Sequence, residues 1–249
     1  MERKDFLRNM FIGATSASLI LQACKKDSST TSSSSGTSTG TNTGTSSGSC
    51  TVSPTETQGP FPTITPSSLV RSDIRVDRTG VGFTVKIYVM NKNTSCSPLA
   101  NAIVDIWHCD KDGYYSEYGG SGMQSVDYTG VHFLRGRQTT DANGLVTFTS
   151  IFPGWYSGRA THIHVHIYNA SGTSLLITQI AFPEGSTSAV ATVNGTAGVA
   201  YGYNKGMSGY TYNASDNIFS DDTAGAEIGT IAGNISDGYT ITQNIYVAA

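Results

Sequence analysis

The chain has 249 residues and only 13% of them are charged, whereas an ordinary soluble domain has about 25%. Downstream of Cys50 the sequence has 10 Lys and Arg residues against 15 Asp and Glu residues. Nucleic-acid binding requires a basic surface, so we expect no nucleic-acid partner. No apolar run reaches the roughly 18 to 20 residues that a membrane-spanning helix needs, which excludes a polytopic membrane protein.

Residues 1–24 have the features of a targeting segment. Basic residues among the first eight positions are followed by an apolar run over 10–21, and the segment ends at Cys24. This pattern resembles a bacterial lipoprotein signal. The resemblance implies lipidation of Cys24, attachment to the membrane through that lipid, and an extracytoplasmic location in the periplasm or at the cell surface. The basic start also resembles a loose twin-arginine signal, which would suit export of a domain already folded around a cofactor.

Residues 25–50 are predicted to form a linker to a domain that spans 51–249. From position 28 to position 49, every residue except Asn42 is Ser, Thr or Gly. Such a sequence has no apolar surface to bury, so it is typical of a flexible tether.

Three cysteines remain once Cys24 is assigned to the lipid anchor. In an exported protein, a Cys50–Cys96 disulfide would clamp the start of the domain to a later loop. Pairing of Cys96 with Cys109 is less favourable, because an extended strand between them would hold their Cα atoms beyond the limit of ~7 Å. We therefore expect Cys109 to be a free or buried thiol.

The domain has the periodicity of β-strands. Phe83, Val85, Ile87 and Val89 alternate with other residues, which is typical of a half-buried strand. Further β-branched or aromatic runs lie at 102–108, 145–149, 162–168, 175–182 and 239–247. Many short strands with Gly-rich turns predict an all-β sandwich or barrel with little helix. The stretch 185–236, rich in Gly, Ala, Ser and Asn, predicts long loops.

Three histidines occupy alternate positions of one predicted strand. Residues two apart project from the same face of a strand, so His162, His164 and His166 share a face. Two imidazoles on one strand face can bind one metal ion, and imidazole suits Zn, Cu, Fe and Ni alike. The spacing leaves open which two histidines would be ligands, and a solvated polar face is the alternative.

Four segments around these histidines combine glycine, tyrosine, arginine and histidine at short spacings. In chain order they are Thr57-Gln58-Gly59-Pro60-Phe61, Gly113-Tyr114-Tyr115, Pro153-Gly154-Trp155-Tyr156 and Arg159-Ala160-Thr161-His162-Ile163-His164. Their order and composition resemble the intradiol ring-cleavage dioxygenases, the family of the catechol and protocatechuate dioxygenases. The resemblance covers roughly Ser53 to Glu184. It implies an all-β sandwich of the intradiol dioxygenase type, with long loops and little helix.

The resemblance also implies a non-haem Fe(III) site with four ligands: Tyr115, Tyr156, His162 and His164. Two phenolates are hard anionic donors that favour Fe(III), and their coordination requires the usual phenol pKa near 10 to fall. The Gly-x-Tyr spacing selects Tyr115 over Tyr114.

Three residues are implied in catalysis: Arg159, Tyr156 and Gln179. Arg159 would lie beside the substrate as a fixed cation, Tyr156 would accept a substrate proton, and Gln179 would bond a substrate oxygen or Arg159. The implied reaction cleaves a catechol with O2 to a cis,cis-muconate-type diacid.

The remaining histidines and Cys109 are expected to lie outside the ligand set. His166 is excluded from the ligand set and is expected to be a partner of the ligands or solvated. His108 and Cys109 are expected to pack at a strand end, and His132 to lie in a loop. Two alternatives remain open: a non-catalytic, lipid-anchored binding module, and a Zn or Cu β-sandwich that uses all three strand histidines.

Overall fold

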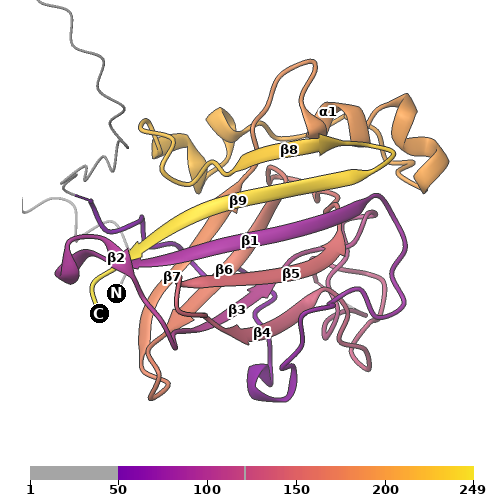
Figure 1. Cartoon of the computed structure of the whole chain (residues 1–249). Helices are drawn as coiled ribbons and strands as arrows, with labels where there is room; N and C mark the ends of the chain where they lie inside the picture. The colour runs from indigo at the N-terminus through magenta and orange to yellow at the C-terminus, as the bar shows by residue number, and fades with distance from the viewer. Residues whose placement is uncertain (1–49, 121) are drawn as a thin grey trace, which may run out of the picture. The chain divides into compact units, whose positions relative to one another are not determined.

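The computed structural model describes residues 50–120 and 122–249, which form two β-sheets (Figure 1). The first sheet has the order β2 (Ser97–Pro98), β1 (Gly82–Asn91), β9 (Gly238–Val247), β8 (Thr230–Asn234), with β5 (Leu145–Ile151) also paired to β1. The second has the order β4 (Arg135–Thr139), β3 (Ile103–Trp107), β6 (His162–Tyr168), β7 (Ser174–Ala181). The predicted signal segment, and the predicted linker up to residue 49, lie outside the described residues.

The two longest strands, β1 and β9, run parallel beside each other, and every other named strand pair is antiparallel. Residues of β1 alternate between buried and partly exposed, with Phe83, Val85, Ile87 and Val89 on the buried face. This confirms the alternation seen in the sequence. The apolar side chains of both sheets then meet in one core, because each sheet must bury its apolar face against another element.

Strand β6 lies in the middle of its sheet, between β3 and β7. Its residues from His162 to Ile167 are all buried. Ile163, Val165 and Ile167 belong to the core between the sheets. The three histidines therefore point to the other face of the sheet, which the N-terminal segment of the domain partly covers.

Six predicted strands are present, and the 162–168 strand has the bounds that its sequence indicates. The sequence did not indicate β2, β4 or β8. The expectation that 185–236 is only loop is wrong in part, because this stretch contains α1 (Ala189–Val193), three 3-10 helices and β8. These helices are η3 (Thr196–Tyr201), η4 (Asn213–Ser215) and η5 (Phe219–Asp221). Two further 3-10 helices lie earlier, η1 (Pro66–Ser68) and η2 (Lys92–Thr94).

The start of the domain is fixed at several places. Cys50 and Cys96 form a disulfide with a Cα–Cα distance of 6.0 Å, and Cys109 is free and buried, as expected. Farther along, the Glu56 N–H donates to the Ile177 carbonyl, which ties this segment to the edge of β7. Within the described residues no helix has the length and apolar character to cross a membrane.

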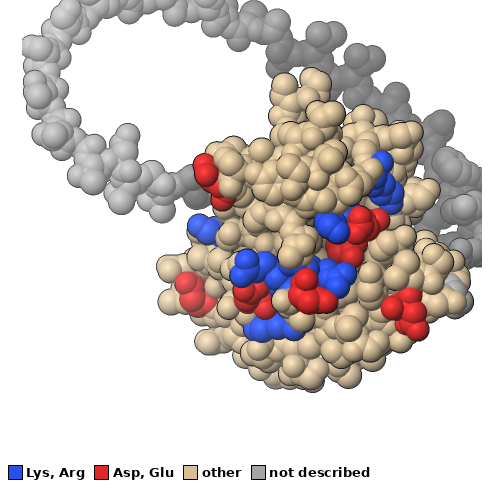
Figure 2. Space-filling view, turned by 90° about the vertical axis from the view of Figure 1, so that its right-hand side faces the viewer, with Lys and Arg blue, Asp and Glu red and all other residues tan. Residues whose placement is uncertain are grey.

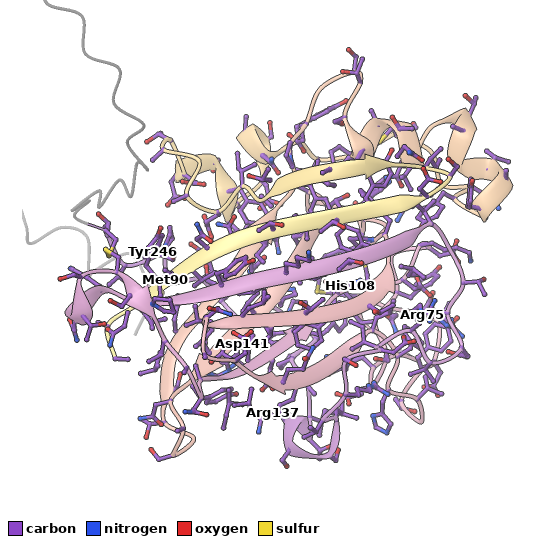
Figure 3. All side chains as sticks on the ribbon, viewed as in Figure 1. Arg75, Met90, His108, Arg137, Asp141 and Tyr246 are labelled. Carbon is purple, nitrogen blue, oxygen red and sulfur yellow. A yellow bond between two sulfur atoms is a disulfide. The ribbon has the colours of Figure 1, made fainter. Side chains whose placement is uncertain are left out.

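Charged side chains of both signs lie close together on one end of the domain. Figure 2 shows Lys and Arg gathered with Asp and Glu across this face, and Arg75 in Figure 3 lies at the same end of the sandwich. Arg75 pairs with Asp73 at 2.6 Å, and Arg78 with Asp77 at 2.6 Å. The cations and anions are thus neutralised locally, and this face has no single sign of charge.

Candidate metal centre

The first two histidines of β6 direct their Nε2 atoms to a common point. These two atoms, of His162 and His164, lie 3.1 Å apart. His162 Nδ1 lies 2.6 Å from the Ala160 carbonyl oxygen, which can only accept a hydrogen bond. Nδ1 of His162 therefore carries the hydrogen, and Nε2 presents a lone pair, which is the form of histidine that binds metals.

Tyr115 reaches the same point from the loop that follows β3. Its side chain is fully buried, and its hydroxyl lies 3.2 Å from His162 Nε2. The backbone of Tyr115 is held by the Gln124 amide, which accepts from its N–H at 2.7 Å and donates to its carbonyl at 2.8 Å. Tyr114 instead packs near Tyr128, with ring centroids 6.3 Å apart. The structure thus places Tyr115, rather than Tyr114, at the site.

Tyr156 lies in the loop between β5 and β6 and is half-buried. Its ring centroid is 5.8 Å from that of Tyr115 and 5.5 Å from that of His162. The four side chains that the sequence predicts as ligands therefore come together, two from one strand and two from separate loops.

Two motif glycines explain how the two tyrosine loops pack. Gly113 has φ +93°, and a β-carbon there would overlap the Trp155 carbonyl oxygen. A β-carbon at Gly154 would lie 2.5 Å from the Lys111 carbonyl oxygen. Each loop thus needs a glycine where its backbone touches the other loop. The glycines of the Gly-x-Tyr and Pro-Gly-x-Tyr segments set the separation of Tyr115 and Tyr156.

Three of the donor atoms, those of Tyr115, His162 and His164, have spacings that fit a single metal ion. Two ligands at right angles, each ~2.1 Å from one ion, are about 3.0 Å apart, close to the 3.1 and 3.2 Å measured at His162 Nε2. The other ring nitrogen of His164 is buried without a hydrogen-bond partner among the described residues. Two phenols beside two imidazoles form a harder donor set than the Cys and His ligands of structural zinc sites.

Burial controls the charge of these groups. Burial, and then the charge of Arg159, lowers the pKa of His162 to about 3, and burial lowers the pKa of His164 well below its usual value. Both imidazoles are therefore neutral and ready to bind a metal. Burial raises the pKa of both Tyr115 and Tyr156. A bound cation would oppose that effect and favour the phenolates.

Arg159 and Gln179 are also brought together, as the sequence indicates. An Arg159 guanidinium nitrogen donates to Gln179 Oε1 at 2.7 Å, and the Gln179 amide donates to the Thr57 carbonyl at 3.0 Å. The charge of Arg159 also lowers the pKa of Tyr156, against the larger effect of burial. Gln179 therefore supports Arg159, which is one of the two roles expected for it.

The sequence did not reveal two further residues of the site, Asp216 and Phe219. Arg159 Nε lies 2.8 Å from Asp216 Oδ2, and the Arg159 guanidinium lies 5.5 Å from the Phe219 ring centroid. Both residues are buried. They lie in the stretch expected to be loop, where a single Asp or Phe gives no periodic signal.

The N-terminal segment covers His164 from one side. Gly59 has φ +66°, and a β-carbon there would lie 2.8 Å from His164 Cε1, so even alanine would overlap the imidazole. The Trp107 ring stacks on the His164 ring, with centroids 5.0 Å apart and planes 3° apart. Phe61 stacks on Tyr115 with a centroid distance of 4.8 Å. The Thr-x-Gly-Pro-Phe segment thus encloses two of the candidate ligands.

His166 does not join the other two strand histidines. Its Nε2 lies 2.8 Å from Ser174 Oγ, and its Nδ1 lies 2.8 Å from the Tyr168 hydroxyl. No three His, Cys, Asp or Glu side chains in 50–120 and 122–249 are grouped to hold a metal ion. A site made of all three histidines is therefore absent from this part of the chain.

The remaining histidines have structural partners. His108 lies in the interior between strands (Figure 3), where its ring nitrogens lie 2.8 Å from the Cys109 carbonyl and 2.7 Å from Ser150 Oγ. This confirms that it packs at the end of β3. His132 was expected to be only a loop residue, but its Nδ1 also lies 2.8 Å from a carboxylate oxygen of the buried Glu117.

The chain is similar to known dioxygenases. A family model described as "Dioxygenase" matches residues 62–197. Chlorocatechol 1,2-dioxygenase of Rhodococcus opacus is 32% identical over 152 residues, 50% of this chain and 54% of that protein. Catechol 1,2-dioxygenase 1 of Acinetobacter lwoffii is 28% identical over 96 residues, which are 31% of this chain and 29% of that protein. The chain thus matches about half, or less, of the length of these curated relatives.

Solved structures match a larger share. An intradiol ring-cleavage dioxygenase from Tetranychus urticae is 32% identical with a TM-score of 0.67, and the match covers 80% of this chain and 95% of that chain. The dioxygenase domain of a dioxygenase and carbohydrate-binding fusion protein from Streptomyces sp. SirexAA-E is 26% identical with a TM-score of 0.55. That match covers 80% of this chain and 99% of that domain.

Proposed function

Because the chain belongs to the intradiol ring-cleavage dioxygenase family, we propose that it is an enzyme that cleaves a catechol-type ring with O2. The bond between the two hydroxyl-bearing carbons breaks, both oxygen atoms enter the product, and a cis,cis-muconate-type diacid results. The clustering of Tyr115, Tyr156, His162 and His164 at one place carries this proposal.

We propose Fe(III) as the cofactor, held by these four residues. When bound, it supplies the Lewis acidity that favours the catecholate and makes the ring reactive toward O2. The donor set supports Fe(III), since two phenolates and two neutral imidazoles leave a trivalent ion with little excess charge.

Tyr156 is the group that we propose to receive a proton from the substrate. It is half-buried, whereas Tyr115 is fully buried, so Tyr156 is the phenol that an incoming catechol can reach. Its phenolate oxygen can accept a catechol hydroxyl proton, and the charge of Arg159 favours the phenolate form.

Arg159 is proposed to stabilise the negative charge that develops on the ring. Its guanidinium is held by Gln179 and Asp216, so it needs no reorganisation during the reaction. Phe61 and Phe219 are buried beside the candidate ligands and limit the access of water.

The proposal is tested with purified protein loaded with ferric ion. We expect one iron per chain, a visible tyrosinate-to-iron absorption band that a catechol shifts, and O2 uptake with a panel of catechol, protocatechuate, hydroxyquinol and chlorinated catechols. Tyr156→Phe should weaken the band and the turnover. A colourless protein with stoichiometric zinc or copper, or a protein that binds catechols unchanged after Tyr156→Phe and takes up no O2, would contradict the proposal.

We also propose that the chain is exported and anchored through a lipid on Cys24. The Cys50–Cys96 disulfide supports export, because disulfides persist in oxidising compartments. Metabolic labelling with a radioactive fatty acid should mark the wild type and not Cys24→Ser. Equal labelling of the two proteins would exclude Cys24 as the lipidated residue.

A further inference from the structure

We infer that Asp216 is a positioning residue for the ring-cleavage reaction: its buried carboxylate fixes Arg159 toward the substrate and also fixes the backbone that orients His162. This inference rests on the proposed function for its catalytic consequence, but its structural part concerns the protein without any metal. Asp216 lies outside the stretch 62–197 that the family model matches.

The Asp216 carboxylate is fully buried and makes four hydrogen bonds. Oδ2 accepts from Arg159 Nε at 2.8 Å and from the Ala160 N–H at 2.7 Å. Oδ1 accepts from Arg159 Nε at 3.1 Å and from the Ile218 N–H at 2.8 Å. Asn has the same shape but carries an NH2 group in place of one acceptor oxygen, so Asp216→Asn must lose part of this set.

The arginine has little freedom once this pair is formed. Asp216 holds Nε, and Gln179 holds one terminal nitrogen at 2.7 Å. The guanidinium is planar, so fixing two of its nitrogens fixes the direction of the third. The charge of Arg159 lowers the pKa of Tyr156, which places the guanidinium near this candidate ligand.

The same carboxylate acts on His162 through one peptide unit. The Ala160 N–H donates to Asp216, and the Ala160 carbonyl accepts from His162 Nδ1 at 2.6 Å. The bond from Nδ1 sets which nitrogen of His162 faces the metal position. Asp216 therefore anchors both the fixed cation and the residue that sets the tautomer of a candidate ligand.

The segment around Asp216 is itself tied to the start of β6. The Tyr210 hydroxyl accepts from the Thr161 N–H at 3.0 Å and donates to Glu184 at 2.9 Å. Asn213 donates to Glu184 and to the Phe182 carbonyl. The segment that contains Tyr210 and Asp216 thus accepts hydrogen bonds from two successive N–H groups before His162, those of Ala160 and Thr161. Asp216 is therefore held in place by more than its ion pair with Arg159.

The test compares Asp216→Asn with Asp221→Asn, which changes an exposed Asp in the same segment. In the metal-free protein, 15N NMR should show the Arg159 Nε–H, assigned by its loss in Arg159→Lys, as a slowly exchanging signal. Asp216→Asn should abolish that protection, and Asp221→Asn should keep it. Unchanged protection in Asp216→Asn would overturn the inference whatever the protein's activity.

Catalysis gives the second readout. In the enzyme saturated with iron, Asp216→Asn should lower kcat by roughly 10- to 100-fold through Arg159, the usual cost of removing such a partner, and should shift the absorption band through His162. In an Arg159→Lys background the same substitution should lower kcat less than about threefold, because residues that act together do not add. Equal losses in both backgrounds would overturn the inference. A wild type that binds no iron and takes up no O2 would instead overturn the proposed function. The NMR experiment uses the metal-free protein, so its result tests the role of Asp216 independently of the proposed function.

Discussion

Gly113 lies against the Trp155 carbonyl so closely that any side chain at position 113 would overlap it. This contact joins the loop of Tyr115 to the loop of Tyr156. The two phenols therefore depend on each other's backbone, and the position of either one is not a local property of its own loop.

Gly113→Ala should separate these loops and weaken metal binding. The substitution combines a backbone overlap with a positive φ, so we expect a loss of about 1–3 kcal/mol in unfolding free energy. Iron per chain and thermal unfolding measure the two effects. Gly130→Ala is the matched control, because a β-carbon there meets nothing within 4 Å. Equal behaviour of the two variants would contradict the role given to Gly113.

Tyr115→Phe should remove most of the visible absorption band and lower the iron content, because it deletes a buried donor atom while keeping the ring. Tyr114→Phe makes the same chemical change one residue earlier, outside the site, and should keep both. Absorption spectra and iron analysis of the two variants, prepared with equal amounts of iron, test this difference. The assignment fails if Tyr114→Phe loses the band and Tyr115→Phe keeps it.

His164→Ala and His166→Ala should differ in metal binding although both remove an imidazole from β6. His164 Nε2 faces His162, whereas both ring nitrogens of His166 have partners elsewhere. We expect the first variant to lose iron and the second to retain it, as measured by metal analysis after dialysis. Loss of metal from His166→Ala but not from His164→Ala would contradict this expectation and support a site that uses His166.

Glu227 should make the protein less stable as the pH rises. Burial, and then the charges of Glu56, Asp222, Asp221 and Asp216, raises the pKa of Glu227 to about 8. A carboxyl whose pKa is raised in the folded state favours folding below its unfolded pKa near 4.5. This contribution is lost as the pH rises through 8.

The variant Glu227→Gln removes this titration. Its melting temperature should exceed that of the wild type increasingly between pH 5 and pH 9, by roughly 2–4 °C for each kcal/mol of repulsion removed. Calorimetry across that range checks the trend. A difference in melting temperature that stays constant from pH 5 to pH 9 would show that Glu227 does not titrate in this range.

The strands with clear alternation or β-branched runs, such as 83–89 and 162–168, could be predicted because the pattern of their own residues indicates which side chains are buried. β4 could not, because its sequence Arg-Gly-Arg-Gln-Thr has no apolar residue. Arg135 is nevertheless fully buried, since the Phe61 and Ser116 carbonyls accept its hydrogen bonds. Those acceptors are distant in sequence, so no local pattern reveals them.

The candidate ligands were predictable from short segments, whereas Asp216 was not. Tyr115, Tyr156 and the two histidines stand in spacings that the loops and strand β6 impose locally. Asp216 meets Arg159 across 57 positions of the chain, and its segment has no repeating pattern. A single carboxylate in a polar stretch cannot be distinguished by sequence from one that faces water.

The parallel pairing of β1 with β9 constrains when this domain can fold. β9 lies between β1 and β8, and it follows all the other strands of residues 50–120 and 122–249 in the sequence. Phe83 of β1 lies opposite Tyr239 of β9, so this edge of β1 stays unpaired until two segments far apart in the sequence have met. Completion of the first sheet is thus a long-range folding step, and we expect it to be slower than formation of the local β8–β9 pair.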